Sequence, residues 1–235
     1  MIRRICFHAG PGAGKSTLAA RTFAELKVRG HNVEHIPEYI KTWAYAGRKP
    51  TSYDQLYVYA KQLHAEDAAL KHVPLVVTDS PLIMNNAYAA FYGCEFVDPM
   101  VNMSRRFEKD FPAVNFFIER SVDYVTDGRY QTYEQAIEFD DHLKAFLAKN
   151  LPGPLIPVTV DKFDNIMNCI EQFLKGDMEC PQNSSTATPS LPRSEPRSRR
   201  KSHGWLARHV WPLFSAATTR LARCTSRRSD GPATK

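Results

Sequence analysis

The chain has 235 residues, enough for one to two domains, and 43% of them are hydrophobic and 11% aromatic. This composition supplies a core, which excludes a fibrous or wholly disordered protein. No stretch approaches the roughly 18 uninterrupted apolar residues of a membrane span, and the first residues do not resemble a signal peptide. The five cysteines form no CxxC pair, which argues against a disulfide scaffold and a zinc site and predicts a cytoplasmic protein.

Charge is distributed unevenly along the chain. Residues 176–235 hold 11 Lys and Arg against 4 Asp and Glu, so they account for the whole formal net charge of +6. Proline and serine are also frequent in this segment, which cannot bury enough apolar surface to offset the entropy lost on ordering. We therefore predict a folded domain over residues 1–175 and a mostly disordered, basic tail over residues 176–235.

Apolar periodicity within the first 175 residues alternates between strands and helices. Short apolar runs predict five buried strands, at residues 3–9, 32–37, 73–78, 114–118 and 155–160. Longer amphipathic segments predict helices at residues 16–29, 52–71, 83–91, 99–109, 133–149 and 161–174. Thr51 or Ser52 is expected to cap the second of these helices. The alternation predicts an α/β fold of the P-loop NTPase type, with a five-stranded parallel sheet covered by helices on both faces.

A phosphate-binding loop lies between the first predicted strand and the first predicted helix, where residues 9–17 read AGPGAGKST. Backbone N–H groups of such a loop converge on phosphate oxygens, and the helix N-terminus adds partial positive charge. A Rossmann loop is excluded because a lysine stands where its last glycine is required. The residues expected to contact ATP are Gly10, Pro11, Gly12, Ala13, Gly14, Lys15, Ser16 and Thr17.

Three side chains of this loop have separate expected roles. Lys15 is expected to face solvent and to reach the β- and γ-phosphates, and the Ser16 hydroxyl is expected to bind Mg²⁺. Thr17, one residue further, is placed to contact the α-phosphate. Ala9 departs from the G-x-x-x-x-G-K-[ST] pattern, but its methyl group is small enough to leave the turn intact.

The loop does not say which NTPase this is. The chain lacks the Asn-Lys-x-Asp guanine reader of GTPases and the LSGGQ sequence of transporters. Helicases and AAA-type motors place Asp-Glu at the end of a strand, whereas here the strand at 73–78 is followed by Asp79-Ser80-Pro81. A carboxylate without a water-activating glutamate favours a small kinase, in which water must be kept from the transferred phosphoryl group.

Four segments in this order resemble small P-loop kinases of bacteriophages, relatives of the thymidylate-kinase and nicotinamide-riboside-kinase groups: residues 9–17, Pro37-Glu38-Tyr39, residues 78–81 and Asp127-Gly128-Arg129. The resemblance spans most of residues 1–175. One subfamily of this group phosphorylates 5-hydroxymethyl-deoxyuridine within phage DNA. The resemblance implies a kinase that uses ATP and Mg²⁺, with a nucleotide-class acceptor, and a host cytoplasm if the chain is phage-encoded.

The resemblance also implies roles for four charged residues. Asp79 is expected beside the first strand, as a Mg²⁺ ligand or the base for the acceptor hydroxyl; its alternative role is to cap the helix after Pro81. Glu38 is the other candidate base or substrate-binding carboxylate, or else a solvated loop acid. Arg120 and Arg129 match lid arginines that clamp the migrating phosphoryl group, with surface ion pairs as the alternative.

Two further segments are candidate binding regions. Lys41, Arg48 and Lys49, together with Tyr39, Trp43, Tyr45 and Tyr53, mix basic and aromatic groups that can stack a base and contact phosphate, or simply pack at the edge of the core. The basic tail can bind a nucleic acid backbone, or, less favoured, a membrane surface, or no specific partner. The sequence therefore predicts a kinase, most specifically of 5-hydroxymethyluracil in DNA, with free nucleosides, nucleotides or nicotinamide riboside as alternative acceptors and a DNA-tethered ATPase switch as the alternative class.

Overall fold

The structure of this chain is a computed structural model that describes residues 2–48, 50–51, 53–121, 124 and 131–176. The tail predicted for residues 176–235 lies, from residue 177 onward, outside the described residues, as does Arg129. The last described helix ends at Lys175, and the domain boundary at 175/176 stays a prediction. No helix among the described residues is both long and apolar enough to cross a membrane.

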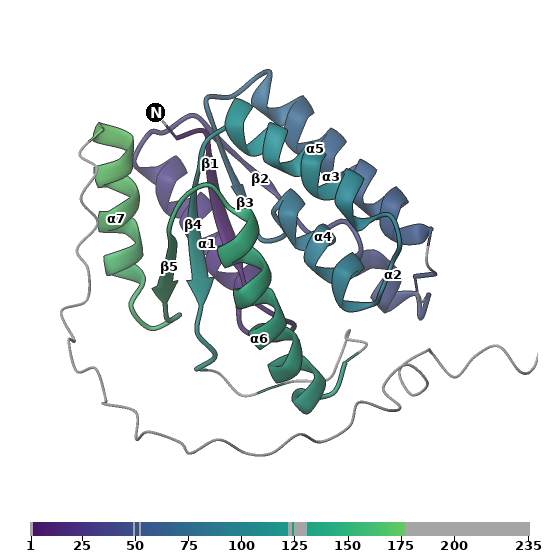
Figure 1. Ribbon diagram of the computed structural model, residues 1–235. Coiled ribbons are helices and arrows are strands. Elements are labelled where there is room, and N and C mark those ends of the chain that lie inside the picture. The colour runs from purple at the N-terminus through teal and green to yellow at the C-terminus, as the bar shows by residue number, and fades with distance from the viewer. Residues whose placement is uncertain (1, 49, 52, 122–123, 125–130, 177–235) are drawn as a thin grey trace, which may run out of the picture. The chain divides into compact units, whose positions relative to one another are not determined.

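Five strands form one parallel sheet in the order β2-β3-β1-β4-β5 (Figure 1). The strands are β1 Arg4–His8, β2 Val33–Ile36, β3 Leu75–Thr78, β4 Ala113–Ile118 and β5 Leu155–Val158. The predicted parallel sheet is confirmed, and each strand end differs from its expected position by at most two residues. Parallel strands need crossover connections, which the intervening helices supply.

All six predicted helices are present, together with a short one that the periodicity did not predict. The helices are α1 Lys15–Val28, α2 Lys41–Tyr45, α3 Asp54–Leu70, α4 Leu82–Phe91, α5 Val97–Asp110, α6 Tyr133–Asn150 and α7 Phe163–Lys175. The five residues of α2 are too few to show a helical repeat. The predicted cap of α3 is wrong for Thr51, because the N-cap is Tyr53 and the Thr51 hydroxyl donates to Asp54 instead. Ser52 lies outside the described residues.

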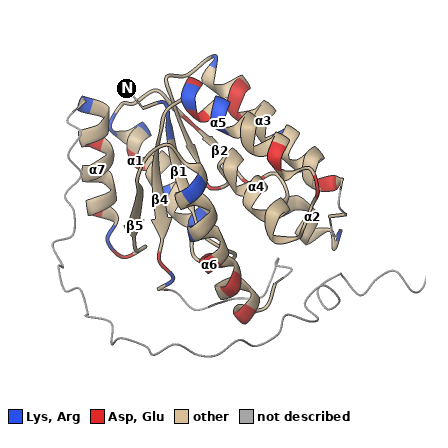
Figure 2. Ribbon diagram, in the orientation of Figure 1, with Lys and Arg blue, Asp and Glu red and all other residues tan. Residues whose placement is uncertain are grey.

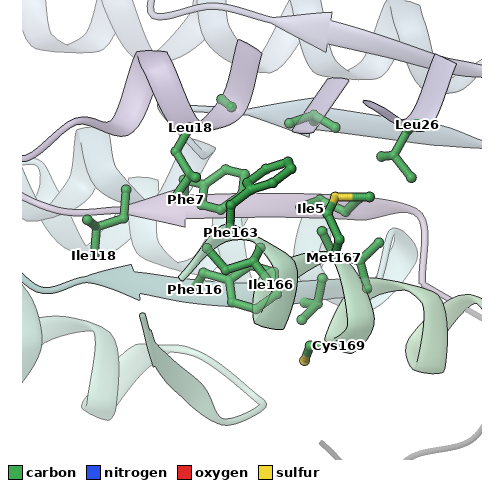
Figure 3. Packing of buried hydrophobic residues seen from close by; sticks show 14 of the residues in the cluster. Ile5, Phe7, Leu18, Leu26, Phe116, Ile118, Phe163, Ile166, Met167 and Cys169 are labelled. Carbon is green, nitrogen blue, oxygen red and sulfur yellow. The ribbon is translucent and has the colours of Figure 1, made fainter. Parts of the chain in front are cut away.

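Helices cover both faces of the sheet, with α1 and α7 on one face and α3, α4, α5 and α6 on the other (Figure 1). Alternation along β1 sends Ile5 and Phe7 to the α1–α7 face, where Phe7 stacks on Phe116 with ring centroids 5.5 Å apart. Phe163 and Met167 of α7 close this core (Figure 3). The packing of α1 on β1 fixes where the phosphate-binding loop between them lies.

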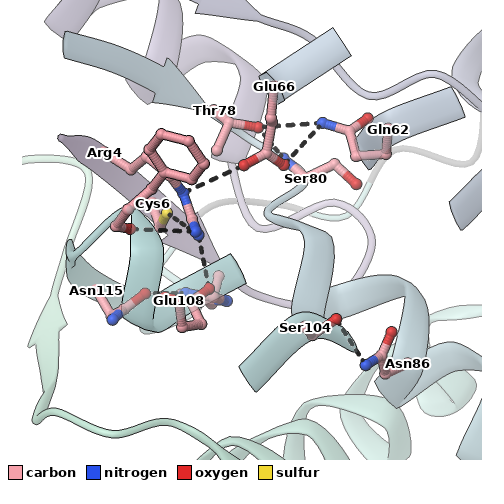
Figure 4. Close-up of polar contacts among 12 residues, drawn as sticks. Arg4, Cys6, Gln62, Glu66, Thr78, Ser80, Asn86, Ser104, Glu108 and Asn115 are labelled. Carbon is pink, nitrogen blue, oxygen red and sulfur yellow. Dashed lines mark hydrogen bonds and ion pairs between the residues drawn. The ribbon is translucent and has the colours of Figure 1, made fainter. Parts of the chain in front are cut away.

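A buried charged group, the Arg4 cluster, lies on the opposite face of β1 and consists of Arg4, Cys6, Glu66 and Glu108 (Figure 4). The Arg4 guanidinium is fully buried and lies 3.2 Å from Glu66 Oε2 and 2.6 Å from Glu108 Oε1. Two carboxylates thus share one buried cation. Burial, opposed by Arg4 and assisted by Glu108, raises the pKa of Glu66 to about 7.

The cysteines of the described residues differ in state. Cys6 and Cys94 are free, and burial raises the pKa of the Cys6 thiol, which keeps it protonated. Cys169 of α7 is not among these free thiols. His8 is buried and bonded to Asn115, as expected of a histidine packed in a strand.

Glu66 is expected to make the stability of the fold depend on pH. Its folded pKa lies above its unfolded value of 4.5, so the folded chain holds a proton that the unfolded chain has already lost. This contribution to the free energy of unfolding is therefore present below about pH 4.5 and is lost as the pH rises towards 7. We predict that Glu66→Gln removes roughly 3 kcal/mol of this pH dependence across that window, measured by urea unfolding. Glu138→Gln, an exposed acid, is the control; equal pH profiles for the two variants would contradict the prediction.

Candidate functional site

The carboxyl ends of three neighbouring strands bring the predicted site residues to one edge of the sheet. β1 and β2 both pair with β3, in registers that set Cys6 and Ile36 opposite Thr78. The position of β3 beside β1, which the kinase resemblance implied, is confirmed. The phosphate-binding loop, Asp79 and Glu38 follow directly after these three strand ends, so the fold groups them although they are far apart in the sequence.

The loop is held in a tight turn at the start of α1. Gly12 has φ of 79°, a conformation that favours glycine, and a Cβ on it would lie 2.7 Å from the Tyr124 ring. Gly14 is the N-cap of α1, and no side chain among the described residues caps this helix or places an acid in its first turn. The first N–H groups of α1 are therefore available to an anion.

Lys15 lies within the loop and does not face solvent, which corrects the expectation drawn from the sequence. Its side chain is buried, and Nζ donates to the Gly10 carbonyl oxygen at 2.8 Å. Burial lowers the pKa of Lys15, an effect opposed by the carboxylates of Glu38, Asp79 and Asp140. Ser16 is half-buried and Thr17 is exposed in the first turn of α1.

Asp79 is a buried carboxylate with an unsatisfied oxygen. The residue is 1% exposed, and Oδ1 has no hydrogen-bond partner among the described residues. Its alternative role as a helix cap is wrong, because α4 has Pro81 as its N-cap and no side-chain cap. A buried polar atom without a hydrogen-bond partner is costly, so the place of Oδ1 at the site indicates a ligand.

Glu38 follows β2 and differs from Asp79 in its environment. It is half-buried, and burial raises its pKa; Lys15 opposes the shift, Asp79 adds to it and Lys41 opposes it. The carboxyl of Glu38 therefore binds a proton more readily than an ordinary glutamate. Two carboxylates of different character thus act on one lysine.

The residues present fit a magnesium ion held mainly by phosphate oxygens and water. Mg²⁺ takes oxygen ligands and keeps several of its waters, so one or two protein oxygens suffice. The unsatisfied Oδ1 of Asp79 and the hydroxyl of Ser16 are of this kind. Within the described residues, no group of three or more His, Cys, Asp or Glu is arranged to hold a metal alone, which this mode of binding does not require.

Arg120 follows β4 and contacts the loop directly. Nη1 donates to the Pro11 carbonyl oxygen at 2.8 Å, and Nε and Nη2 donate to Asp140 Oδ2 at 3.1 and 2.8 Å. The guanidinium therefore forms an ion pair, but a largely buried one at the site rather than one on the open surface. The second predicted lid arginine, Arg129, lies outside the described residues.

The predicted basic and aromatic region forms a cluster around Trp43, next to Glu38 in the chain. Trp43, Tyr39 and Tyr57 contact one another with ring centroids 5.9–6.2 Å apart, and the Arg48 guanidinium lies 3.4 Å from the centre of the Trp43 ring. Tyr45 and Tyr53 are exposed rather than part of this packing. Lys49 lies outside the described residues. Trp43 itself is buried, so the exposed rings of the region are those of Tyr45, Tyr53 and Tyr57.

The structure adds three residues that the sequence analysis did not predict. Asp140 of α6 accepts from Gly10 N–H and pairs with Arg120. Tyr124 lies against Gly12, and Tyr88 of α4 has a pKa well above its ordinary value, chiefly because it is buried. Figure 2 shows acidic residues in the N-terminal half of α6 and lysines further along it, an order of charges that interacts favourably with the helix dipole. Asp140 is one of these acids.

The chain was compared with protein families, with curated proteins and with solved structures. The family described as an AAA domain matches residues 4–163, from the start of β1 to the first residue of α7. No curated protein matches the chain. Among solved structures, the protein in the crystal structure of APE1195 is 16% identical to this chain, with a TM-score of 0.40, over 76% of this chain and 97% of that one.

Replacement of the loop lysine tests whether the site holds a triphosphate. We predict that Lys15→Ala weakens ATP binding by about 10- to 100-fold, because it removes a charged donor to the phosphates. Lys27→Ala, an exposed lysine of the same helix, is the control and is expected to bind ATP as the unaltered chain does. Both dissociation constants are measured by calorimetry on variants whose circular dichroism shows them folded. Equal affinities for the two variants would contradict the assigned role.

Proposed function

The chain belongs to the family described as an AAA domain, and from this membership we propose that it is an ATP- and Mg²⁺-dependent kinase that phosphorylates a hydroxyl of a nucleotide-class acceptor. One observation carries the proposal. The buried Asp79 stands beside Lys15 at the end of β3, and the next residue is Ser80, so no glutamate follows to activate water. This supports transfer to an acceptor over hydrolysis.

Membership of this family does not make the chain an AAA-type motor. AAA-type motors were set aside because Asp79 is not followed by glutamate, yet the family that matches is described as an AAA domain. The family therefore contains chains without the motor arrangement at this strand end. Nucleotide binding follows from membership, and the choice of kinase over ATPase rests on Ser80 and Glu38.

In the proposed reaction, the loop amides and Lys15 bind the β- and γ-phosphates and orient the terminal phosphoryl group. Ser16 and Asp79 would hold Mg²⁺, which when bound neutralises charge on the phosphate oxygens. Arg120 and Arg129 supply further positive charge, Arg120 from its place against Pro11. Position and electrostatics account for most of the catalysis, because the transition state for phosphoryl transfer needs little covalent help.

The two carboxylates are assigned different roles. Asp79 is almost fully buried beside the loop and suits a metal ligand, whereas the half-buried Glu38 can be reached by an acceptor. The raised pKa of Glu38 suits a base that takes the proton of the acceptor hydroxyl as the phosphoryl group arrives.

Paired variants test this assignment. We predict that Glu38→Gln leaves ATP binding unchanged but lowers kcat by about 10²- to 10⁴-fold, the usual contribution of a general base. Asp79→Asn is expected to remove most of the effect of Mg²⁺ on ATP affinity. The measurements are steady-state kinetics and ATP titrations with Mg²⁺ or EDTA. The opposite pattern, with Asp79→Asn altering only kcat, would reverse the two roles.

The acceptor is proposed from the resemblance and from the Trp43 cluster. The exposed Tyr57 ring, with the Lys61 ammonium over it, can stack a base and contact a phosphate. With the phage kinase resemblance, this favours 5-hydroxymethyluracil in DNA as the acceptor. The basic segment 176–235 is proposed to bind the nucleic acid backbone, which a polymeric substrate would require. A membrane surface is the less favoured partner.

Labelled ATP distinguishes the candidate functions. We predict that, with [γ-³²P]ATP and Mg²⁺, label appears in DNA that contains 5-hydroxymethyluracil and not in the same DNA with thymine. Label in a free nucleoside, nucleotide or nicotinamide riboside would instead support a small-molecule kinase. Release of free phosphate alone would contradict the kinase proposal and support an ATPase switch tethered to DNA.

A further inference from the structure

Asp140 joins two segments of the site that are far apart in the sequence. Its Oδ1 accepts from the Gly10 N–H at 2.5 Å, and its Oδ2 accepts from Nε and Nη2 of Arg120. Arg120 in turn donates to the Pro11 carbonyl oxygen. One carboxylate on α6 therefore holds two consecutive residues of the phosphate-binding loop, one directly and one through an arginine.

The surroundings distinguish this pair from a surface ion pair. The side chains of Arg120 and Asp140 are only 10% and 14% exposed, so solvent screens their interaction weakly. Charge-assisted hydrogen bonds of this kind are about twice as strong as neutral ones. Three donors thus converge on one carboxylate that is largely removed from water.

The close approach of α6 explains why residue 10 lacks a side chain. A Cβ on Gly10 would lie 2.4 Å from Asp140 Oδ1 and 3.0 Å from the carbonyl oxygen of Ala136. This glycine is therefore needed where the loop meets α6. The contact spans 130 residues of sequence and depends on the packing of α6 against the sheet.

The backbone of Gly10 is held at both its N–H and its carbonyl oxygen. Lys15 donates to its carbonyl oxygen while Asp140 accepts from its N–H. Were Lys15 to turn toward a triphosphate in the loop, the contact from Asp140 would still fix Gly10.

We propose that Asp140 is a positioning residue for nucleotide binding, which fixes Gly10 directly and Pro11 through Arg120 so that the loop amides are in place before ATP arrives. The inference rests on the proposed function, since it assumes that the loop binds ATP. Asp140 contacts the loop and not the reacting atoms. Preorganisation of this kind lowers the free energy that binding must spend on ordering the site.

Three variants test the proposal. Asp140→Ala removes both contacts and is expected to raise the dissociation constant for MgATP about tenfold or more. Asp140→Asn keeps an acceptor for the Gly10 N–H but loses the charge that pairs with Arg120, so a smaller increase is expected. Asp141→Asn, which removes the same charge from the exposed neighbouring residue, is the control and is expected to leave the affinity unchanged.

Calorimetry gives the affinities, and thermal unfolding without nucleotide gives the stability of each variant. In the double variant Arg120→Gln/Asp140→Asn, the second substitution is expected to add little, because the two residues act as a unit. If Asp140→Ala binds MgATP as tightly as Asp141→Asn, or loses only thermal stability, the inference is overturned. If the unaltered chain binds no ATP, the proposed function fails first and the inference fails with it.

Discussion

A buried lysine lies near two carboxylates that follow the ends of adjacent strands, and the rest of the site depends on this arrangement of charge. Among charged groups, Glu38 and Asp79 affect the pKa of Lys15 most strongly. Lys15 and Asp79 are buried, and Glu38 is half-buried. Oδ1 of Asp79 has no hydrogen-bond partner among the described residues, while Lys15 donates to a backbone carbonyl that a phosphate oxygen could replace. A phosphate with its cation would satisfy both groups at once.

The sheet order makes this arrangement possible, and a second set of buried charges supports it. β3 lies between β1 and β2, so the residues after each strand meet without a long connection. On the α3–α5 side of the same strands, Arg4 is paired with Glu66 and Glu108. Polar contacts run from there towards the site, because Gln62 reaches both Glu66 and Thr78, and the Thr78 hydroxyl accepts from Ser80 N–H (Figure 4). The turn at Asp79 is therefore held by hydrogen bonds to a buried polar network.

The fold could be predicted from the sequence because its signals are local. Buried parallel strands read as short apolar runs, and the glycine-rich segment at 9–17 identifies the turn into α1. Features no longer than one helical turn were predicted less well, because α2 is too short to show a helical repeat and Thr51 does not cap α3. The burial of Lys15 was also missed, because the sequence does not say how far a loop folds back on itself.

The residues of the site that were missed depend on packing between distant segments. Asp140 follows the buried stripe of α6 that includes Ala136 and Phe139, and an acid beside such a stripe is a signal that sequence alone could offer. The contact of Asp140 with Gly10 could not be predicted from the sequence, because it forms only when α6 packs against the loop. Arg120 was chosen by resemblance, yet its pairing with Asp140 is a property of the fold.

Titration of the unaltered chain with ATP by calorimetry, once with Mg²⁺ and once with EDTA, tests the central claim most directly. If the unsatisfied carboxylate of Asp79 lies where the cation of a bound triphosphate belongs, ATP binds at one site per chain, and affinity falls by about tenfold or more when the cation is removed. Equal affinity under both conditions, or no binding by the folded chain, would contradict the account.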